Sequence, residues 1–292
     1  MEFPEEFDPR FYRASYRDLG RMSDNELRHH YDQYGMAEGR LASSAAHRRG
    51  LTALIPPGAS VLEIGPFCNP AVKGENVRYF DILNRQELIT RAKRTGLAFA
   101  ECPRIDYVSP AGDLSIVGDT FDFVVACHSL EHQPDLVGHL KEVERILNER
   151  GAYLIVVPDK RYCLDFFLAE STIADVIDAH AQRLTVHSLR SVVEHRALIT
   201  HNEAKAHWLG EHGAPRARID GGASIRAALA EHEAANGAYI DVHAWKFTPR
   251  SFRTLLSDVR NLNYTGLEPV RVYDPVLNSS EFCAILRKGS PG

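Results

Sequence analysis

The sequence predicts one doubly wound α/β fold, in which a mostly parallel sheet is covered by helices on both faces. Four short apolar runs, at residues 61–65, 77–83, 121–130 and 151–159, alternate with segments long enough to form helices. These runs are continuously apolar, as expected for strands that are buried on both faces. Strands that alternate with helices in this way form parallel crossover units, so we expect a Rossmann-like sheet.

The composition is that of a globular protein and excludes several partners. With 292 residues, of which 44% are hydrophobic, the chain is long enough to bury a core. The net charge of −5 provides no basic surface field, so we expect no nucleic-acid partner. No apolar run reaches the roughly 20 residues of a membrane span, and the acidic start MEFPEEFDPR is unlike a signal peptide. We therefore expect a cytoplasmic protein without membrane insertion.

The cysteines predict neither a zinc site nor a disulfide framework. They are scattered, odd in number and include no CxxC pair. We expect all five to be reduced, namely Cys68, Cys102, Cys127, Cys163 and Cys283.

Residues 1–45 predict a small helical appendage, with tyrosines and leucines at helical spacing and helix stops at Gly35 and Gly39. The stretch from residue 7 to residue 40 also resembles a short module of bacterial glycan-assembly proteins, often found beside glycosyltransferases. That resemblance implies association with a glycosyltransferase; a homo-oligomer is the alternative assembly.

The rest of the chain predicts a core that is interrupted by a cap. Residues 46–160 form the first part of the core, which ends in an amphipathic helix with leucines or valine at 136, 140, 143 and 147 and then a strand. Residues 161–245 are polar and rich in His, Arg and Ala, and predict a cap insertion. Residues 246–292 return to the core with the helix FTPRSFRTLLSDV and two antiparallel closing strands, VRVYDPV and EFCAILRK.

Two strand ends carry the pattern of a nucleoside-binding site. Ligands of doubly wound sheets lie at the carboxyl ends of the strands, and Glu63 and Gly65 end the first strand. Gly65 allows the backbone to approach a ligand closely. Asp81 ends the next strand, where a carboxylate can accept both hydroxyls of a ribose. This pattern fits a nicotinamide cofactor as well as S-adenosylmethionine (SAM), and a structural turn is the alternative.

The following block distinguishes between these cofactors. FDFVVACHSLEHQPDLVGHLKEVERILNERGAYLIVVPD resembles the central stretch of the class I SAM-dependent methyltransferase superfamily. The resemblance implies a seven-stranded sheet, a methyltransferase activity and SAM as cofactor. The loop GPFCNP departs from the glycine-rich family pattern, and Asp113 stands near the place of the acid that meets adenine. The implied cofactor-binding residues are Glu63, Gly65, Pro66, Phe67, Asp81, Ile82, Asp113, Leu114 and Cys127.

Methyl transfer to a hydroxyl requires removal of its proton, and the strand that faces the methyl group supplies two imidazoles. His128 and His132 are therefore candidate catalytic bases, with Glu131 between them. A Glu-His pair that only anchors the turn is the alternative.

The same three residues also suggest a metal site. His128-x-x-Glu131-His132 resembles the ExxEH ligands of small-RNA ribose and ubiquinone-pathway O-methyltransferases, which implies a divalent ion that polarises the acceptor oxygen. Histidine in place of the first glutamate favours an ion softer than magnesium. A packed turn without metal is again the alternative.

The acceptor is expected under the cap. His207, Trp208 and His212 offer an aromatic face and planar polar groups that suit a carbohydrate, unless they only line a solvated helix. PDKRYCLDFF resembles a stretch in methyltransferases of polysaccharide clusters. It places Asp159, Lys160 and Arg161 at the acceptor, with a salt-bridged loop as the alternative.

Together these patterns predict a SAM-dependent O-methyltransferase that acts on a hydroxyl of a sugar or glycan-like acceptor. One alternative is a methyltransferase for a small natural product or a quinone-like acceptor. The others are a non-catalytic SAM-binding scaffold beside a glycosyltransferase and a nicotinamide-dependent oxidoreductase.

Overall fold

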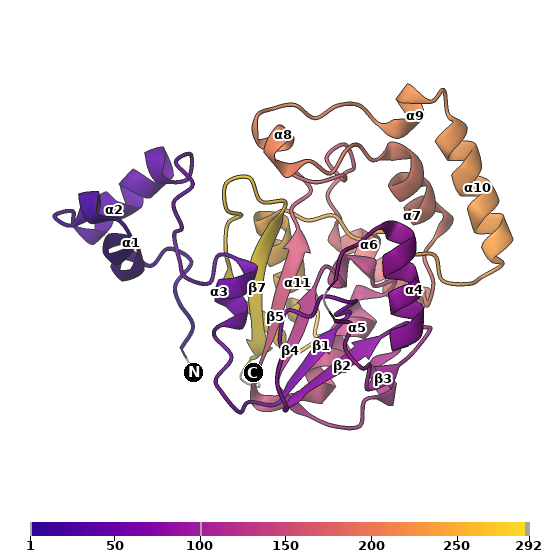
Figure 1. The fold of residues 1–292 in the computed structure, drawn as a ribbon, viewed down its shortest axis with the longest axis horizontal. Helices are drawn as coiled ribbons and strands as arrows, with labels where there is room; N and C mark the ends of the chain where they lie inside the picture. The colour runs from indigo at the N-terminus through magenta and orange to yellow at the C-terminus, as the bar shows by residue number, and fades with distance from the viewer. Residues whose placement is uncertain (1, 100, 290–292) are drawn as a thin grey trace.

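The core of the protein is a single mixed sheet. A helical cap covers the carboxyl ends of its parallel strands. The computed structural model describes residues 2–99 and 101–289. In these residues seven strands are arranged in the order β3-β2-β1-β4-β5-β7-β6 (Figure 1). The doubly wound fold predicted from the sequence is therefore confirmed.

The first five strands run parallel to one another, and the last two close the sheet. The parallel strands are β1 (Val61–Ile64), β2 (Val77–Asp81), β3 (Tyr107–Val108), β4 (Phe121–Cys127) and β5 (Leu147–Pro158). β7 (Glu281–Lys288) lies antiparallel between β5 and β6 (Leu267–Val272), as the two closing segments predicted. The two-residue strand β3 escapes sequence inspection because it is not part of an apolar run.

Helices cover both faces of this sheet. On one face lie α5 (Leu136–Ile146), α6 (Ile173–Ala181) and α11 (Pro249–Asn261), whose apolar sides share a buried cluster with the strands. On the other face lie α3 (Arg48–Thr52) and α4 (Arg85–Thr95). Local signals set the helix starts, since Asn84 and Thr248 form capping boxes and Pro249 takes the first helical position.

Two further parts stand outside the sheet. The amino-terminal helices α1 (Pro9–Ser15) and α2 (Asp24–His30) pack around their own small core, which includes Tyr12 and Leu27 (Figure 1). The cap lies over the carboxyl ends of the strands and contains α7 (Leu189–Val193), α8 (Ala204–Trp208), α9 (Arg216–Ile219) and α10 (Ala223–Ala235) (Figure 1). Among the described residues, no helix combines the length and apolar character needed to cross a membrane.

The expectation that all five cysteines are reduced is wrong for two of them. Cys68 and Cys102 form a disulfide. The loop after β1 and the segment after α4 pack in one buried cluster that brings these cysteines together, although they lie 34 positions apart. Cys127, Cys163 and Cys283 are free.

Candidate active site

One cavity opens at the carboxyl ends of β1, β2 and β4, and a smaller one lies between α6 and α7. The first cavity has a volume of about 430 Å³, within the usual range for small-molecule sites. The sheet, helix α4 and the last part of the cap all contribute to its wall. The lining residues are Ile64, Gly65, Phe67, Phe80, Asp81, Ile82, Leu88, Arg91, Thr95, Leu97, Gly112, His128, Ser129, His132, Gln133, Tyr239 and Asp241.

The turn after β1 contains two residues with positive φ. Its sequence, GPFCNP, has only one glycine, so a residue with a side chain takes the second of these positions. Gly65 has φ 67°, and a Cβ there would lie 3.1 Å from the Cβ of Ser129. Phe67 has φ 49°, a left-handed conformation that costs free energy in a residue with a side chain. The adjacent disulfide of Cys68 and the stacking of Arg91 over the Phe67 ring hold this conformation in place.

Asp81 stands at the end of β2 with the geometry expected of a ribose ligand. It lines the cavity and is 7% exposed, and its Oδ1 accepts a hydrogen bond from the backbone N–H of Leu83. Burial raises the pKa of Asp81 to about 6, against the opposing effect of nearby backbone N–H groups. The carboxylate is thus mainly ionised at neutral pH and available as an acceptor.

Four of the nine predicted cofactor residues line the cavity: Gly65, Phe67, Asp81 and Ile82. The other five, Glu63, Pro66, Asp113, Leu114 and Cys127, are not among its lining residues. Glu63 instead accepts hydrogen bonds from the N–H groups of Ala71 and Val72, so it shapes the loop from within the core. Asp113 caps the short helical turn 114–116.

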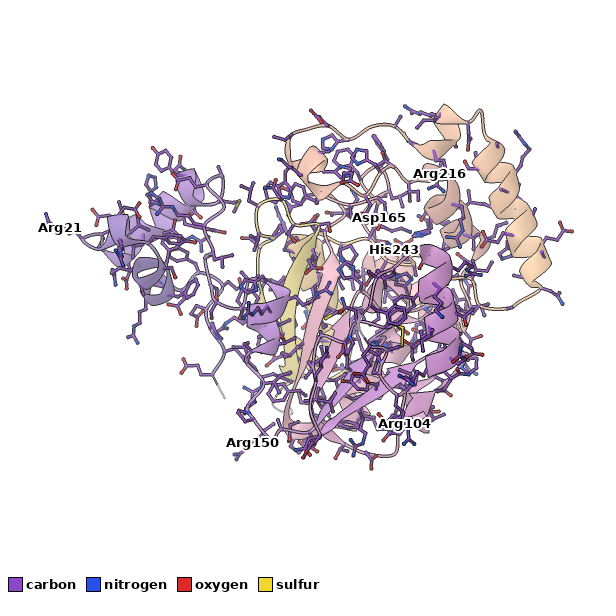
Figure 2. All side chains as sticks on the ribbon, viewed as in Figure 1. Arg21, Arg104, Arg150, Asp165, Arg216 and His243 are labelled. Carbon is purple, nitrogen blue, oxygen red and sulfur yellow. A yellow bond between two sulfur atoms is a disulfide. The ribbon has the colours of Figure 1, made fainter. Side chains whose placement is uncertain are left out.

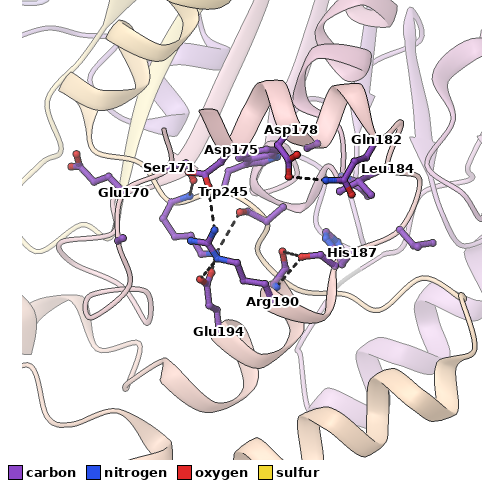
Figure 3. Close-up of a pocket in the computed structure, with 18 residues that line it drawn as sticks. Glu170, Ser171, Asp175, Asp178, Gln182, Leu184, His187, Arg190, Glu194 and Trp245 are labelled. Atoms are coloured by element: carbon purple, nitrogen blue, oxygen red, sulfur yellow. Dashed lines mark hydrogen bonds and ion pairs between the residues drawn. The ribbon is translucent and has the colours of Figure 1, made fainter. Parts of the chain in front are cut away.

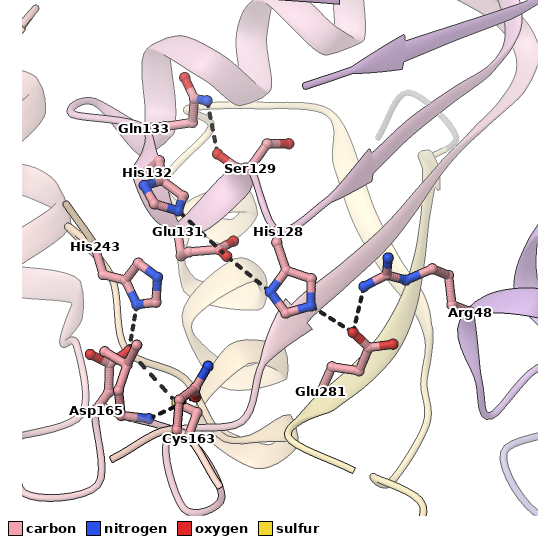
Figure 4. A network of polar contacts seen from close by, with 12 residues as sticks. Arg48, His128, Ser129, Glu131, His132, Gln133, Cys163, Asp165, His243 and Glu281 are labelled. Atoms are coloured by element: carbon pink, nitrogen blue, oxygen red, sulfur yellow. Dashed lines mark hydrogen bonds and ion pairs between the residues drawn. The ribbon is translucent and has the colours of Figure 1, made fainter. Parts of the chain in front are cut away.

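A cluster of imidazoles and carboxylates lies at the end of β4, where His128 and His132 line the cavity (Figure 4). Glu131 is 1% exposed, and neither of its carboxylate oxygens accepts a hydrogen bond. His128 Nδ1 lies 3.4 Å and His132 Nε2 3.9 Å from Glu131 Oε1. A buried carboxylate without hydrogen bonds is unfavourable unless nearby positive charge compensates it.

The cap adds a third imidazole to the cluster. Glu131, His132 and His243 bring one potential ligand atom each to within 4.8 Å of one another. His243 Nδ1 shares a hydrogen bond of 2.6 Å with the buried Asp165, and His132 Nδ1 lies 2.9 Å from Asp241. Figure 2 shows Asp165 and His243 between the cap and the sheet. Each imidazole therefore has a carboxylate behind it, which is the usual support for a metal-binding histidine.

His128 has a different set of contacts from those of a ligand. Its Nε2 lies 2.6 Å from Glu281 of β7, which also pairs with Arg48. Burial would lower the pKa of His128, but Glu131 and Glu281 raise it to about 9. His128 is therefore a cation at neutral pH, and its φ of 54° marks strain at this position.

Neighbouring charges also shift the pKa values of Glu131 and His132. Burial favours the neutral form of Glu131, but the charges of His128 and His132 outweigh it and hold the pKa below its ordinary value. Burial opposes protonation of His132, yet Asp241 and Glu131 raise its pKa. The arrangement thus attracts positive charge, which either protons or a cation can supply.

The structure places the six predicted acceptor residues away from this centre. Trp208 stacks on Tyr162 with a ring separation of 3.9 Å and donates its N–H to the carbonyl of Ser279. His207 and His212 stack on Phe166 and contact each other through their Nδ1 atoms. None of them lines either cavity, because their polar and aromatic surfaces are used inside the cap.

The three predicted acceptor residues in the loop after β5 also lie away from the cluster. Asp159 is fully buried and pairs with Arg161, and Lys160 donates to the carbonyl of Phe166. This is the salt-bridged loop that stood as the alternative, and none of the three residues lines either cavity.

The second cavity lies between α6, α7 and residues 244–246 and is a poorer candidate. Its volume is about 130 Å³, below the usual range for a cofactor. Figure 3 shows Arg190 paired with both Asp175 and Glu194. Lys246 is bound to Glu194 as well.

Sequence reasoning missed the residues that complete the centre from distant segments. These are Arg91, Asp165, Asp241, His243 and Glu281. The only sequence signal is the alternation of polar and apolar residues in YIDVH (Tyr239 to His243), which sets Asp241 and His243 apart from their apolar neighbours.

A cavity at the carboxyl ends of parallel strands is where doubly wound folds bind their ligands. Comparison with known families adds the class of domain. Residues 69–155 match the family model described as a methyltransferase domain. This segment therefore contains the methyltransferase domain that the sequence resemblance predicted, with SAM as its cofactor. A comparison with curated proteins finds no match.

Several solved structures are similar to this chain at low identity. A SAM-dependent methyltransferase from Clostridium acetobutylicum ATCC 824 is 12% identical, with 91% of this chain and 99% of that chain covered and a TM-score of 0.42. The CcbJ methyltransferase from Streptomyces caelestis is 12% identical, with coverage of 90% and 96% and a TM-score of 0.42. The mitomycin 7-O-methyltransferase MmcR is 14% identical over 92% of this chain, with a TM-score of 0.40, and this chain spans 61% of its length.

Proposed function

We propose that the protein transfers a methyl group from SAM to a hydroxyl of a sugar or glycan-like acceptor. The observation that carries this proposal is the hydrogen-bond-deficient carboxylate of Glu131, which is buried among imidazoles beside the cofactor cavity. Methyl transfer to a hydroxyl needs a group that removes or weakens the O–H bond. A site that concentrates positive charge beside the methyl donor meets this need, because it stabilises a developing alkoxide.

The cofactor side of the proposal uses four residues. Asp81 accepts the ribose hydroxyls, and Gly65 and Phe67 shape the turn that approaches the cofactor. Ile82 offers an apolar contact beside Asp81. The methyl group then faces residues 128–133, where the acceptor hydroxyl would lie in line with the sulfur for displacement.

For the metal hypothesis we propose Glu131, His132 and His243 as the ligands, in place of the sequence-predicted set with His128. His128 is held as a cation between Glu131 and Glu281, whereas His132 and His243 each have a supporting carboxylate. A divalent ion bound there would polarise the acceptor hydroxyl and lower its pKa. Two imidazoles and one carboxylate suit a transition metal better than magnesium.

The second hypothesis assigns the proton transfer to His132 alone. Asp241 would orient the imidazole, which is the role of a carboxylate behind a general base. His128 is less suited to this role, since a pKa of about 9 leaves it protonated at neutral pH.

Titration with Co²⁺, followed by visible absorption, separates the two hypotheses. The metal hypothesis predicts stoichiometric binding that Glu131→Gln and His243→Gln each weaken at least roughly tenfold. His180→Gln serves as the control, because His180 pairs with Asp135 outside the cluster. If the wild-type protein binds no Co²⁺, and methyl transfer survives a chelator, the metal hypothesis is wrong and His132 acts as the base.

The acceptor class is tested by a screen of hydroxylated compounds with labelled SAM. The sugar hypothesis rests on the amino-terminal module that resembles glycan-assembly proteins and on the polar character of the cap. Transfer to glycosides supports it. Transfer only to quinones or other apolar natural products would contradict it, and no transfer to any class with intact SAM binding would favour the scaffold alternative.

We also propose that the chain works in the cytoplasm, as a homo-oligomer or beside a glycosyltransferase. The structure forms a disulfide between Cys68 and Cys102, whereas cytosolic disulfides are rare, so this location predicts that the cellular thiol pool reduces this bond in the native protein. Quantitative thiol labelling of the native protein tests it, and a fully oxidised pair would contradict it.

A further inference from the structure

The end of the cap reaches the cofactor cavity through an extended segment with alternating side chains. Residues 239–243 connect α10 to α11, and this loop returns to the sheet past α4 (Figure 1). Ile240 and Val242 are buried in the small core of the cap, with Val192 and Ala228. Tyr239 and Asp241 take the opposite side and line the cofactor cavity.

Asp241 makes two charged contacts, one to an arginine and one to a histidine. One oxygen pairs with Arg91 of α4, and the other lies 2.9 Å from His132 Nδ1. Tyr239 donates its O–H to the same carboxylate at 3.4 Å. Arg91, His132, Tyr239 and Asp241 all line the cavity.

The two contacts join parts of the site with different roles. Arg91 belongs to the cofactor side, since its guanidinium lies 5.8 Å from the centre of the Phe67 ring in the turn after β1. His132 belongs to the methyl-facing side at the end of β4. Asp241 is tied to the cap, because Arg196 of the cap donates a hydrogen bond to its carbonyl.

We propose that Asp241 is a latch that closes the cap over the bound cofactor and, in the same movement, positions His132. Opening of the segment separates Asp241 from Arg91 and His132 together, which widens the cavity for cofactor exchange. Closing restores both contacts, so His132 is correctly positioned only when the cap covers the cavity. Asp241 is a positioning residue, since it acts through Arg91 and His132 rather than on the acceptor.

The inference rests on the proposed cofactor site and predicts a specific kinetic change. If the latch holds the closed form, its loss speeds dissociation of S-adenosylhomocysteine (SAH) more than it slows association. We expect Asp241→Asn to raise the SAH dissociation rate roughly tenfold, and Arg91→Leu roughly fivefold, because the latter removes one contact and leaves the other. Rapid filtration with labelled SAH and an excess of unlabelled SAM measures this rate.

Glu231→Gln is the matched control. Glu231 pairs with Arg196 within the cap and does not line the cavity, so its loss should leave the dissociation rate unchanged. An equal rise in this control would overturn the latch, because general loosening of the cap would then explain the result.

A double-mutant cycle gives the second readout. The Arg91→Leu and Asp241→Asn pair should dissociate little faster than Asp241→Asn alone, because the asparagine has already removed the charge that both contacts need. Fully multiplicative rates, or unchanged rates in both single variants, would overturn the latch. Failure of the wild-type protein to bind SAH is a distinct result, which refutes the cofactor site itself and the latch with it.

Discussion

The cofactor side and the acceptor side of the cavity are built in different ways. On the cofactor side, Gly65 and Asp81 come from the ends of neighbouring parallel strands, so the sheet alone determines that they meet. On the other side, His132 meets His243 and Asp241 from a segment more than 100 positions later in the chain, and only the docking of the cap brings them together. The sheet therefore positions the residues of the proposed cofactor side, whereas the packing of the cap positions Asp241 and His243 beside His132.

The largest expected effect comes from substitution of Asp81, the proposed ribose ligand. Asp81→Ala should weaken SAH binding roughly 100-fold, because two hydrogen bonds to a charged group are lost together. Calorimetric titration measures the dissociation constant. Asp113→Ala is the control, and its affinity should change less than roughly threefold because Asp113 only caps a turn. Equal effects of the two substitutions would show that Asp81 has no special place in the cofactor site.

The pH dependence of SAH binding is a second test of the role of Asp81. Burial raises the pKa of Asp81 to about 6, so its carboxylate is ionised above this pH and protonated below it. Because the ionised form accepts the ribose hydroxyls, affinity should fall about tenfold between pH 7 and pH 5. Asp81→Asn should lose this dependence, as it has no proton to gain in that window. An unchanged wild-type affinity at pH 5 would contradict the assignment.

The smallest expected effect concerns the predicted acceptor residues of the cap. Trp208→Ala removes the stack on Tyr162 and the N–H bond to Ser279, so we expect the unfolding temperature to fall by about 3 °C. Its SAH affinity should stay within roughly twofold of wild type. Leu209→Ala, at an exposed neighbour, should change neither quantity. A large loss of acceptor turnover in Trp208→Ala, at unchanged stability, would return Trp208 to the acceptor site.

The sequence predicted the elements that local pattern determines. Continuous apolar runs identified β1, β2, β4 and β5, and the glycine and the carboxylate at the ends of β1 and β2 both line the cavity. The two-residue strand β3 has too little pattern to be recognised. The disulfide of Cys68 and Cys102 depends on tertiary packing of two loops, which spacing does not reveal.

One physical reason explains why the predicted acceptor residues line neither cavity. Residue types that suit a sugar also suit one another, and Trp208, His207 and His212 use their surfaces on Tyr162 and Phe166 inside the cap. His128 likewise has the right position for a base, but Glu281 from β7 keeps it protonated. Neither outcome is visible in a single sequence, because each depends on which distant side chains pack beside these residues in the folded protein.

The most direct test of the central claim is a crystal structure of the protein with SAH and Mn²⁺. The account predicts that the ribose lies on Asp81, that the sulfur faces residues 128–133, and that manganese lies among Glu131, His132 and His243. A cofactor bound elsewhere, or a metal in another place with the three side chains unoccupied, would contradict the claim that cofactor cavity and cluster form one active site.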